Sequence, residues 1–183
     1  MKTCWIMVCV VGLCAGALLA EEPAGTPPAA KVRVGVYDSR AIVVAFVGSP
    51  AYEATDGKKL ADMMAEHSKA KAEGNHKRVA ELEAWGKAQQ ALLHKQVFSN
   101  APVDDILKHI KDQMPMIAKA AGVSSIISKW DKAALAKYPS ADLVDVTMEM
   151  VKAFHPTEER LKVATEIQKH DPIPLKQAEK IND

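Results

Sequence analysis

Histidines and acidic residues are the side chains of this sequence with the clearest potential to bind a metal ion or transfer protons. The six histidines stand at positions 67, 76, 94, 109, 155 and 170, and no two of them are three or four residues apart. Asp105 and His109 lie one helical turn apart and would supply half of a metal site, but a hydrogen-bonded surface pair is the favoured interpretation. We therefore expect no metal site.

Nucleophiles and phosphate-binding loops are the second kind of chemistry to consider. Ser124, Ser125 and Ser128 lie in a segment that reads as a strand and lack the glycine frame of a nucleophile elbow. Gly35 and Gly48 belong to no phosphate-binding loop. The sequence therefore predicts a protein that is not an enzyme, with no catalytic residues and no cofactor.

Methionine and tryptophan offer a different chemistry, the binding of apolar partners. Met63, Met64 and Trp85 are our candidates for such contacts, because methionine is flexible and polarizable and suits promiscuous apolar surfaces. The alternative is that these residues pack with Leu82 between two helices. Taken singly, either methionine fits this alternative better.

Residues 1–20 are typical of a secretory signal peptide, with Lys2, an apolar run and small residues before Glu21. We expect cleavage after Ala20; a retained membrane anchor is the alternative. Cleavage would remove Lys2 from the 24 basic residues and leave 23 against 23 acidic ones. A neutral chain has no global field to attract nucleic acid or an anionic membrane. Cleavage would also remove all three cysteines, Cys4, Cys9 and Cys14.

The segment that follows begins with a flexible leader, residues 21–30, which contains three prolines. Residues 31–37 alternate between apolar and other side chains and predict a half-buried strand. Asp38 and Ser39 predict the start of a helix over residues 40–47, although this apolar run would also suit a buried strand.

Residues 51–98 predict two helices of equal length. Ser49 and Pro50 are suited to the start of the first helix, and the second covers residues 76–98. Gly74 and Asn75 between them favour a turn, so we expect an antiparallel hairpin about 35 Å long. A tip at residues 99–102 would instead give arms of unequal length.

The remaining chain alternates between helix and strand patterns. We expect a helix over 103–121, ended by Gly122, then a strand over 123–130 and a weak strand ending near Tyr138 and Pro139. Residues 143–146 should lead into a helix from Thr147, acting as its cap, to Phe154, and a last helix should cover 157–169.

These elements predict an α+β fold, a small β-sheet body with an antiparallel α-helical hairpin that forms coiled-coil-like arms. The domain organisation is a signal peptide (1–20), a leader (21–30), one domain (31–154) and a C-terminal helix and tail (155–183). Within the domain, the body comprises 31–48 and 103–154, and the helical hairpin comprises 49–102.

Two short segments resemble the Skp (OmpH-like) periplasmic chaperone family. They are KVRVGVYDSR at residues 31–40 and, after IAKAAGVSSIISKW, the Asp145-Val146-Thr147 helix start. The resemblance implies a periplasmic homotrimer that holds unfolded outer-membrane proteins between its arms without ATP. It implies neither nucleic-acid binding nor stable membrane insertion. The strands would join the copies through five apolar residues, Val32, Val34, Val36, Ile126 and Ile127.

Three features depart from that family. The arms are about half the usual length, the mature chain is neutral where the family is basic, and residues 156–183 are an extension. We therefore expect weaker and less salt-sensitive binding of unfolded clients. The alternative function is a non-catalytic structural scaffold of the cell envelope that uses the same body.

Overall fold

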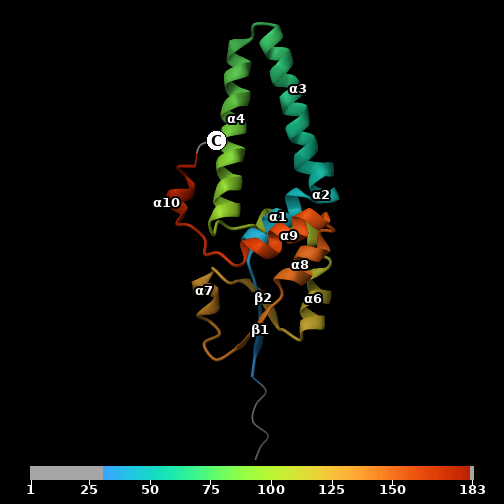
Figure 1. Ribbon diagram of the computed structural model, residues 1–183, viewed down its shortest axis with the longest axis vertical. Helices are drawn as coiled ribbons and strands as arrows, with labels where there is room; N and C mark the ends of the chain where they lie inside the picture. The colour runs from blue at the N-terminus through green and yellow to red at the C-terminus, as the bar shows by residue number, and fades with distance from the viewer. Residues whose placement is uncertain (1–30, 182–183) are drawn as a thin grey trace, which may run out of the picture. The chain divides into compact units, whose positions relative to one another are not determined.

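The computed structural model describes residues 31–181, and its three strands form one parallel sheet in the order β2–β1–β3. The central strand is β1 (Arg33–Tyr37), flanked by β2 (Ser125–Ser128) and β3 (Asp142–Asp145). Parallel neighbours require crossover connections, and both connections here contain helices (Figure 1). The predicted signal peptide and leader lie outside the described residues.

The prediction of a mixed helix and strand protein with a small sheet is confirmed, as is the strand over 31–37. The expectation for residues 138–146 is wrong, because the third strand is Asp142–Asp145 and not a segment ending near Pro139. Aspartates occupy both ends of β3, and Leu143 is 57% exposed. Such an edge strand lacks the apolar alternation by which strands are recognised.

The helix α1 (Ser39–Val47) is the centre of the hydrophobic core. Asp38 caps it, since its carboxylate accepts a hydrogen bond from the backbone N–H of Arg40 at 3.1 Å. Residues 41–46 are all buried because α1 contacts α4, α8 and α9 around it (Figure 1). The predicted helix is confirmed here, and the alternative of a buried strand is wrong.

Two longer helices, α3 (Lys58–Ala72) and α4 (His76–Phe98), follow the short helix α2 (Pro50–Tyr52) and lie side by side (Figure 1). Gly74 between them has φ +68°, as expected of a turn at this position, and the Asn75 side chain caps α4. The first helix is not continuous as expected. A π-helical turn (Glu53–Gly57) interrupts it where Gly57 approaches Tyr52.

The expected single helix over 103–121 is also broken. It comprises α5 (Asp104–Leu107), a 3-10 turn (Lys108–Ile110) and α6 (Met114–Ala121). Pro115 lies in the first turn of α6, where its missing N–H costs nothing, so it starts a new helix. Gly122 ends α6 with φ +64°, as predicted.

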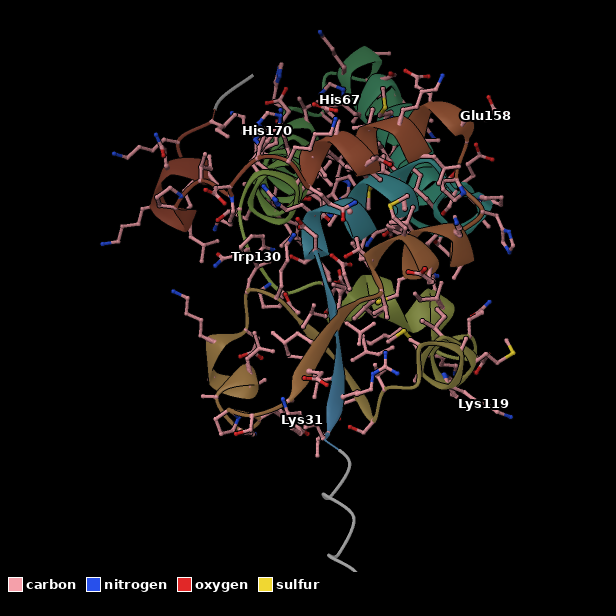
Figure 2. All side chains as sticks on the ribbon, turned by 60° about the horizontal axis from the view of Figure 1, so that its bottom comes forward. Lys31, His67, Lys119, Trp130, Glu158 and His170 are labelled. Atoms are coloured by element: carbon pink, nitrogen blue, oxygen red, sulfur yellow. The ribbon has the colours of Figure 1, made fainter. Side chains whose placement is uncertain are left out.

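The C-terminal part adds four helices to the described structure. They are α7 (Lys132–Leu135), α8 (Thr147–Ala153), α9 (Glu158–Ile167) and α10 (Leu175–Ala178). Figure 2 shows Glu158 and His170 at opposite ends of the α9 region. The bounds of α8 agree with the prediction, but its first N–H is capped by Asp145, at 2.8 Å, and not by Thr147. Within residues 31–181, no helix has the length and apolar composition that spanning a bilayer requires.

Candidate functional site

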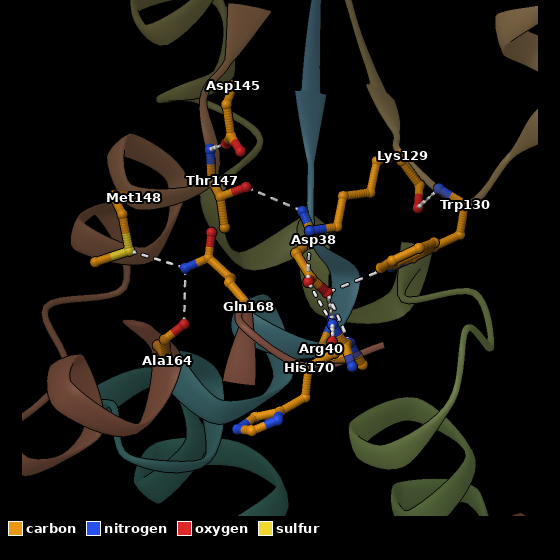
Figure 3. A network of polar contacts seen from close by, with 11 residues as sticks. Asp38, Arg40, Lys129, Trp130, Asp145, Thr147, Met148, Ala164, Gln168 and His170 are labelled. Atoms are coloured by element: carbon orange, nitrogen blue, oxygen red, sulfur yellow. Dashed lines mark hydrogen bonds and ion pairs between the residues drawn. The ribbon is translucent and has the colours of Figure 1, made fainter. Parts of the chain in front are cut away.

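The carboxyl ends of the three strands meet in a buried polar cluster, here called the Asp38 cluster (Asp38, Arg40, Lys129, Trp130 and Thr147; Figure 3). The Asp38 carboxylate is fully buried and accepts hydrogen bonds from Arg40 Nε at 3.1 Å and Nη2 at 2.8 Å. Lys129 Nζ lies 2.7 Å from it and Trp130 Nε1 3.3 Å. Each oxygen of this carboxylate is therefore already occupied by protein donors.

The Asp38 cluster joins segments that are far apart in sequence. Thr147 Oγ1 accepts from the Asp38 backbone N–H at 3.0 Å, and Arg40 Nη2 donates to the His170 carbonyl at 2.7 Å. Burial by itself raises the pKa of Asp38, but hydrogen bonds from Arg40 and Lys129 outweigh it, so the pKa lies below its ordinary value. The geometry is that of a structural junction, and the two segments that carry the family resemblance meet in it.

The groove between α3 and α4, which we call the α3–α4 groove, is the better candidate for binding. It consists of two cavities, of about 280 and 260 Å³, which share the residues Leu60, Trp85 and Gly86. The larger cavity is floored by Val43 and Phe46 of α1. Besides the three shared residues, the smaller one is lined by Met63, Met64, His67, Ser68, Leu82 and Glu83.

The structure brings the three predicted binding residues together in this groove. Met64 is 63% exposed, whereas Met63 and Trp85 are half-buried. Leu82 is buried and supplies the helix contact that the alternative interpretation required. Leu82 therefore packs between the helices, as the alternative interpretation expects. Met64 is open to a partner, as the prediction of a binding surface expects.

Polar pairs join the two helices nearer their turn. Arg78 donates to both carboxylate oxygens of Glu66, at 2.8 and 3.0 Å, and lowers the pKa of Glu66 by doing so. His67 and Glu83 approach to 3.3 Å. Since exposed pairs of this kind are screened by solvent and contribute little to stability, their main effect is to orient α3 against α4.

Gly86 keeps the α3–α4 groove open. A Cβ atom built at this position would have no other atom within 4 Å. In the sequence Gly86 appears only as an interruption of an apolar stripe, and Leu60 as one member of another. Their common role becomes visible once α3 and α4 are placed together. Lys59 Nζ lies 5.5 Å from the Trp85 ring centroid, which adds a cation–π contact at the groove.

The predicted oligomerisation residues have unequal access to a partner. Val32 is 51% exposed, whereas Val34 is fully buried within the chain. Val36, Ile126 and Ile127 are half-buried. Val34 therefore belongs to the core of one chain. Val32, directly before β1, is exposed enough for a second copy to contact it.

The residues considered for metal binding or catalysis make other contacts. Asp105 receives a hydrogen bond from Gln96 at 3.5 Å, and His109 stacks on Phe46 with ring centroids 4.8 Å apart. Ser124 donates to the Arg33 carbonyl and Ser125 lies 3.3 Å from the Tyr138 hydroxyl. Among residues 31–181, no group of three or more His, Cys, Asp or Glu side chains is placed to hold a metal ion.

Comparison with known proteins adds no relative: no family model, no curated protein and no solved structure matches the chain. The resemblance to the Skp family therefore rests on the quoted residues alone.

Proposed function

We propose that this protein is a periplasmic, ATP-independent holdase that binds apolar segments of unfolded outer-membrane proteins in the α3–α4 groove. In this proposal α3 and α4 act as an antiparallel helical hairpin, a short arm beside the sheet. The observation that carries it is the open apolar groove in which Met63, Met64 and Trp85 converge. Residues 1–20 would direct secretion across the inner membrane and then be cleaved off.

The chemistry of the groove suits a client without fixed structure. Unfolded β-barrel proteins expose apolar side chains in many local sequences, so a binder needs adaptable contacts more than one shaped pocket. Methionine provides such contacts, and each apolar contact stabilises by about 25 cal/mol per Å² removed from water. Several weak contacts from neighbouring arms would add through effective concentration.

Assembly into a homotrimer is part of the proposal. Strands β2 and β3 are the two edges of the sheet; Leu143 in β3 is 57% exposed, and Val32, directly before the central strand β1, is 51% exposed. A three-stranded sheet of short strands buries little by itself, so added copies would cover it. The same edges support the second candidate function, a non-catalytic scaffold of the cell envelope.

The test is suppression of aggregation when an unfolded outer-membrane β-barrel protein is diluted from denaturant without ATP. The unmutated protein should suppress aggregation, and the combined change Met63→Ser, Met64→Ser and Trp85→Ser should abolish suppression while helical circular dichroism is retained. Suppression that survives the triple change would refute the site assignment. No suppression by the unmutated protein would refute the holdase and favour the scaffold.

Gly86 provides a matched pair of variants for the same assay. Gly86→Ala adds only a methyl group in open space, whereas Gly86→Glu places a charge inside the groove. We expect normal suppression from the first variant and at least about a fivefold loss from the second, since burying a charge beside apolar client groups is unfavourable. Equal activity of the two variants would count against the groove.

A further inference from the structure

A second apolar groove, here called the α9 groove, lies against α1 on the side of α9. It is formed by α1, α4 and α9 and has a volume of about 410 Å³. Its apolar walls comprise Val44, Val47, Leu93, Val97, Phe98, Val163 and Ile167. Phe98 and Val163 are 43% and 41% exposed, so the groove is open along one side.

Arg160 supplies a cation at one end of the α9 groove. Its side chain makes no ion pair with another residue of the described chain, whereas Glu166 at the same groove is paired with Lys169 at 2.6 Å and approached by His170 at 3.8 Å. The Arg160 stem lies on Gly48, where any Cβ atom would collide with Cγ of Arg160. Gly48 therefore leaves room for the stem of Arg160, an exposed residue at this end of the groove.

The C-terminal segment borders the opposite end of the α9 groove. The Ile173 N–H donates to the Phe98 carbonyl at 2.9 Å, and Ser99 Oγ donates to the Ile173 carbonyl at 2.7 Å. The His170 carbonyl is fixed by Arg40 at 2.7 Å. From Arg160 to Ile167 the helix rises about 10 Å, so the groove is a short apolar trough with a cation at one end and the chain across the other.

We propose that the α9 groove binds a free single-chain carboxylate of medium length, such as a fatty acid. The carboxylate pairs with the Arg160 guanidinium, which offers planar donors that match carboxylate geometry. The alkyl chain lies on Val163 and Ile167 and points toward Phe98. This ligand meets both features of the groove, whereas an uncharged apolar segment would leave the exposed guanidinium of Arg160 in contact with water alone. The α9 groove shares no residue with the cavity that holds Met63 and Met64, although it adjoins the larger cavity of the α3–α4 groove at Val47 and Leu93.

Isothermal titration calorimetry with dodecanoate below its micelle concentration tests the proposal. The full chain should bind dodecanoate with one site, and Arg160→Gln should weaken binding by about tenfold, the usual value of one charge-assisted hydrogen-bond pair. Lys162→Gln is the matched control, because it removes the same charge from an exposed position of α9 that does not line the groove. It should change affinity less than twofold.

Further arms separate the site from other occupants. Dodecanol should bind at least about tenfold more weakly than dodecanoate if Arg160 recognises the charge. Val163→Asp, a substitution at a part-exposed position, should abolish dodecanoate binding with the fold intact, and Gly86→Glu in the other groove should leave it unchanged. The assignment would be overturned if dodecanol bound as tightly as dodecanoate, if Arg160→Gln kept the full affinity, or if Gly86→Glu abolished binding. It would also be overturned if the unmutated protein bound no dodecanoate, for example because a second copy of the chain covers the groove.

Discussion

Asp38 is the residue on which the junction of sheet and helices depends. Its carboxylate is shared by two cations, Arg40 and Lys129, and its backbone N–H is held by Thr147. A buried carboxylate with two cationic partners is favourable only while all its hydrogen bonds are made. Removing the charge leaves Arg40, itself 2% exposed, buried without its counter-charge.

We therefore expect Asp38→Asn to lower the free energy of unfolding by about 3–5 kcal/mol at pH 7. Because the pKa of Asp38 is lowered in the folded protein, its contribution is complete above the unfolded value of about 3.9 and is lost as pH falls through the folded value. Urea unfolding at pH 7 and pH 3 should show the difference between the two proteins narrowing at pH 3. The exposed Asp142→Asn is the control and should have little effect at either pH.

At this scale, only part of the Asp38 cluster could be predicted. Asp38 follows an alternating strand and precedes an apolar run, so its role as a helix cap is visible locally. Its contacts with Lys129, Trp130 and Thr147 span 91 to 109 positions of sequence, and no local pattern specifies them. Met63, Met64 and Trp85 were identifiable by residue type, but only the placement of α3 on α4 shows that Met64 is open and Leu82 is buried.

At the scale of elements, the turn between α3 and α4 was predictable because it requires a residue with positive φ. Gly74 has φ +68°, Gly122 has φ +64°, and both end helices where the sequence indicates. Elements with weak local signals were missed: β3 has only two apolar residues, and α10 only one turn of helix held by the Lys95–Glu179 pair at 2.9 Å. Tertiary contacts, not propensity, determine such short elements.

Two glycine substitutions in this pair of helices should have opposite effects. Gly74→Ala forces a Cβ into the left-handed region and should destabilise by about 1 kcal/mol. Gly86→Ala lies inside α4 with no neighbouring atom and should stabilise by up to about 1 kcal/mol. Urea unfolding followed by helical circular dichroism measures both. An undiminished stability of Gly74→Ala would show that the turn at Gly74 is misplaced, and a destabilised Gly86→Ala would contradict the open position of Gly86.

At the scale of the whole molecule, one apolar helix organises the core. Helix α1 contacts the long helix α4, the helix α8 that follows β3, and the C-terminal helix α9. The C-terminal extension is thus part of the fold, since Ala164 of α9 is fully buried. The prediction of a helix over residues 157–169 follows from their periodic apolar residues, but no local pattern indicates that this helix packs on α1.

Oligomeric state is the whole-molecule property on which the proposal depends. We expect a trimer at micromolar concentration, because the sheet has two open edges, and Leu143 in β3 and Val32 directly before β1 are exposed. Light scattering after size exclusion measures the mass, and Val32→Lys should shift it toward the monomer by placing like charges at the contact. A monodisperse monomer of the unmutated protein would exclude a cavity enclosed by three arms.

Site-specific photo-crosslinking tests the holdase proposal most directly. Residues 21–183 contain no cysteine, so Met64→Cys and Met116→Cys in this mature chain each carry one photo-crosslinker, at positions of nearly equal exposure, 63% and 65%. In the presence of an unfolded outer-membrane protein, we predict strong crosslinks from position 64 in the α3–α4 groove and few from position 116 on α6. Equal crosslinking from both positions, or none from position 64, would contradict the binding of clients in this groove.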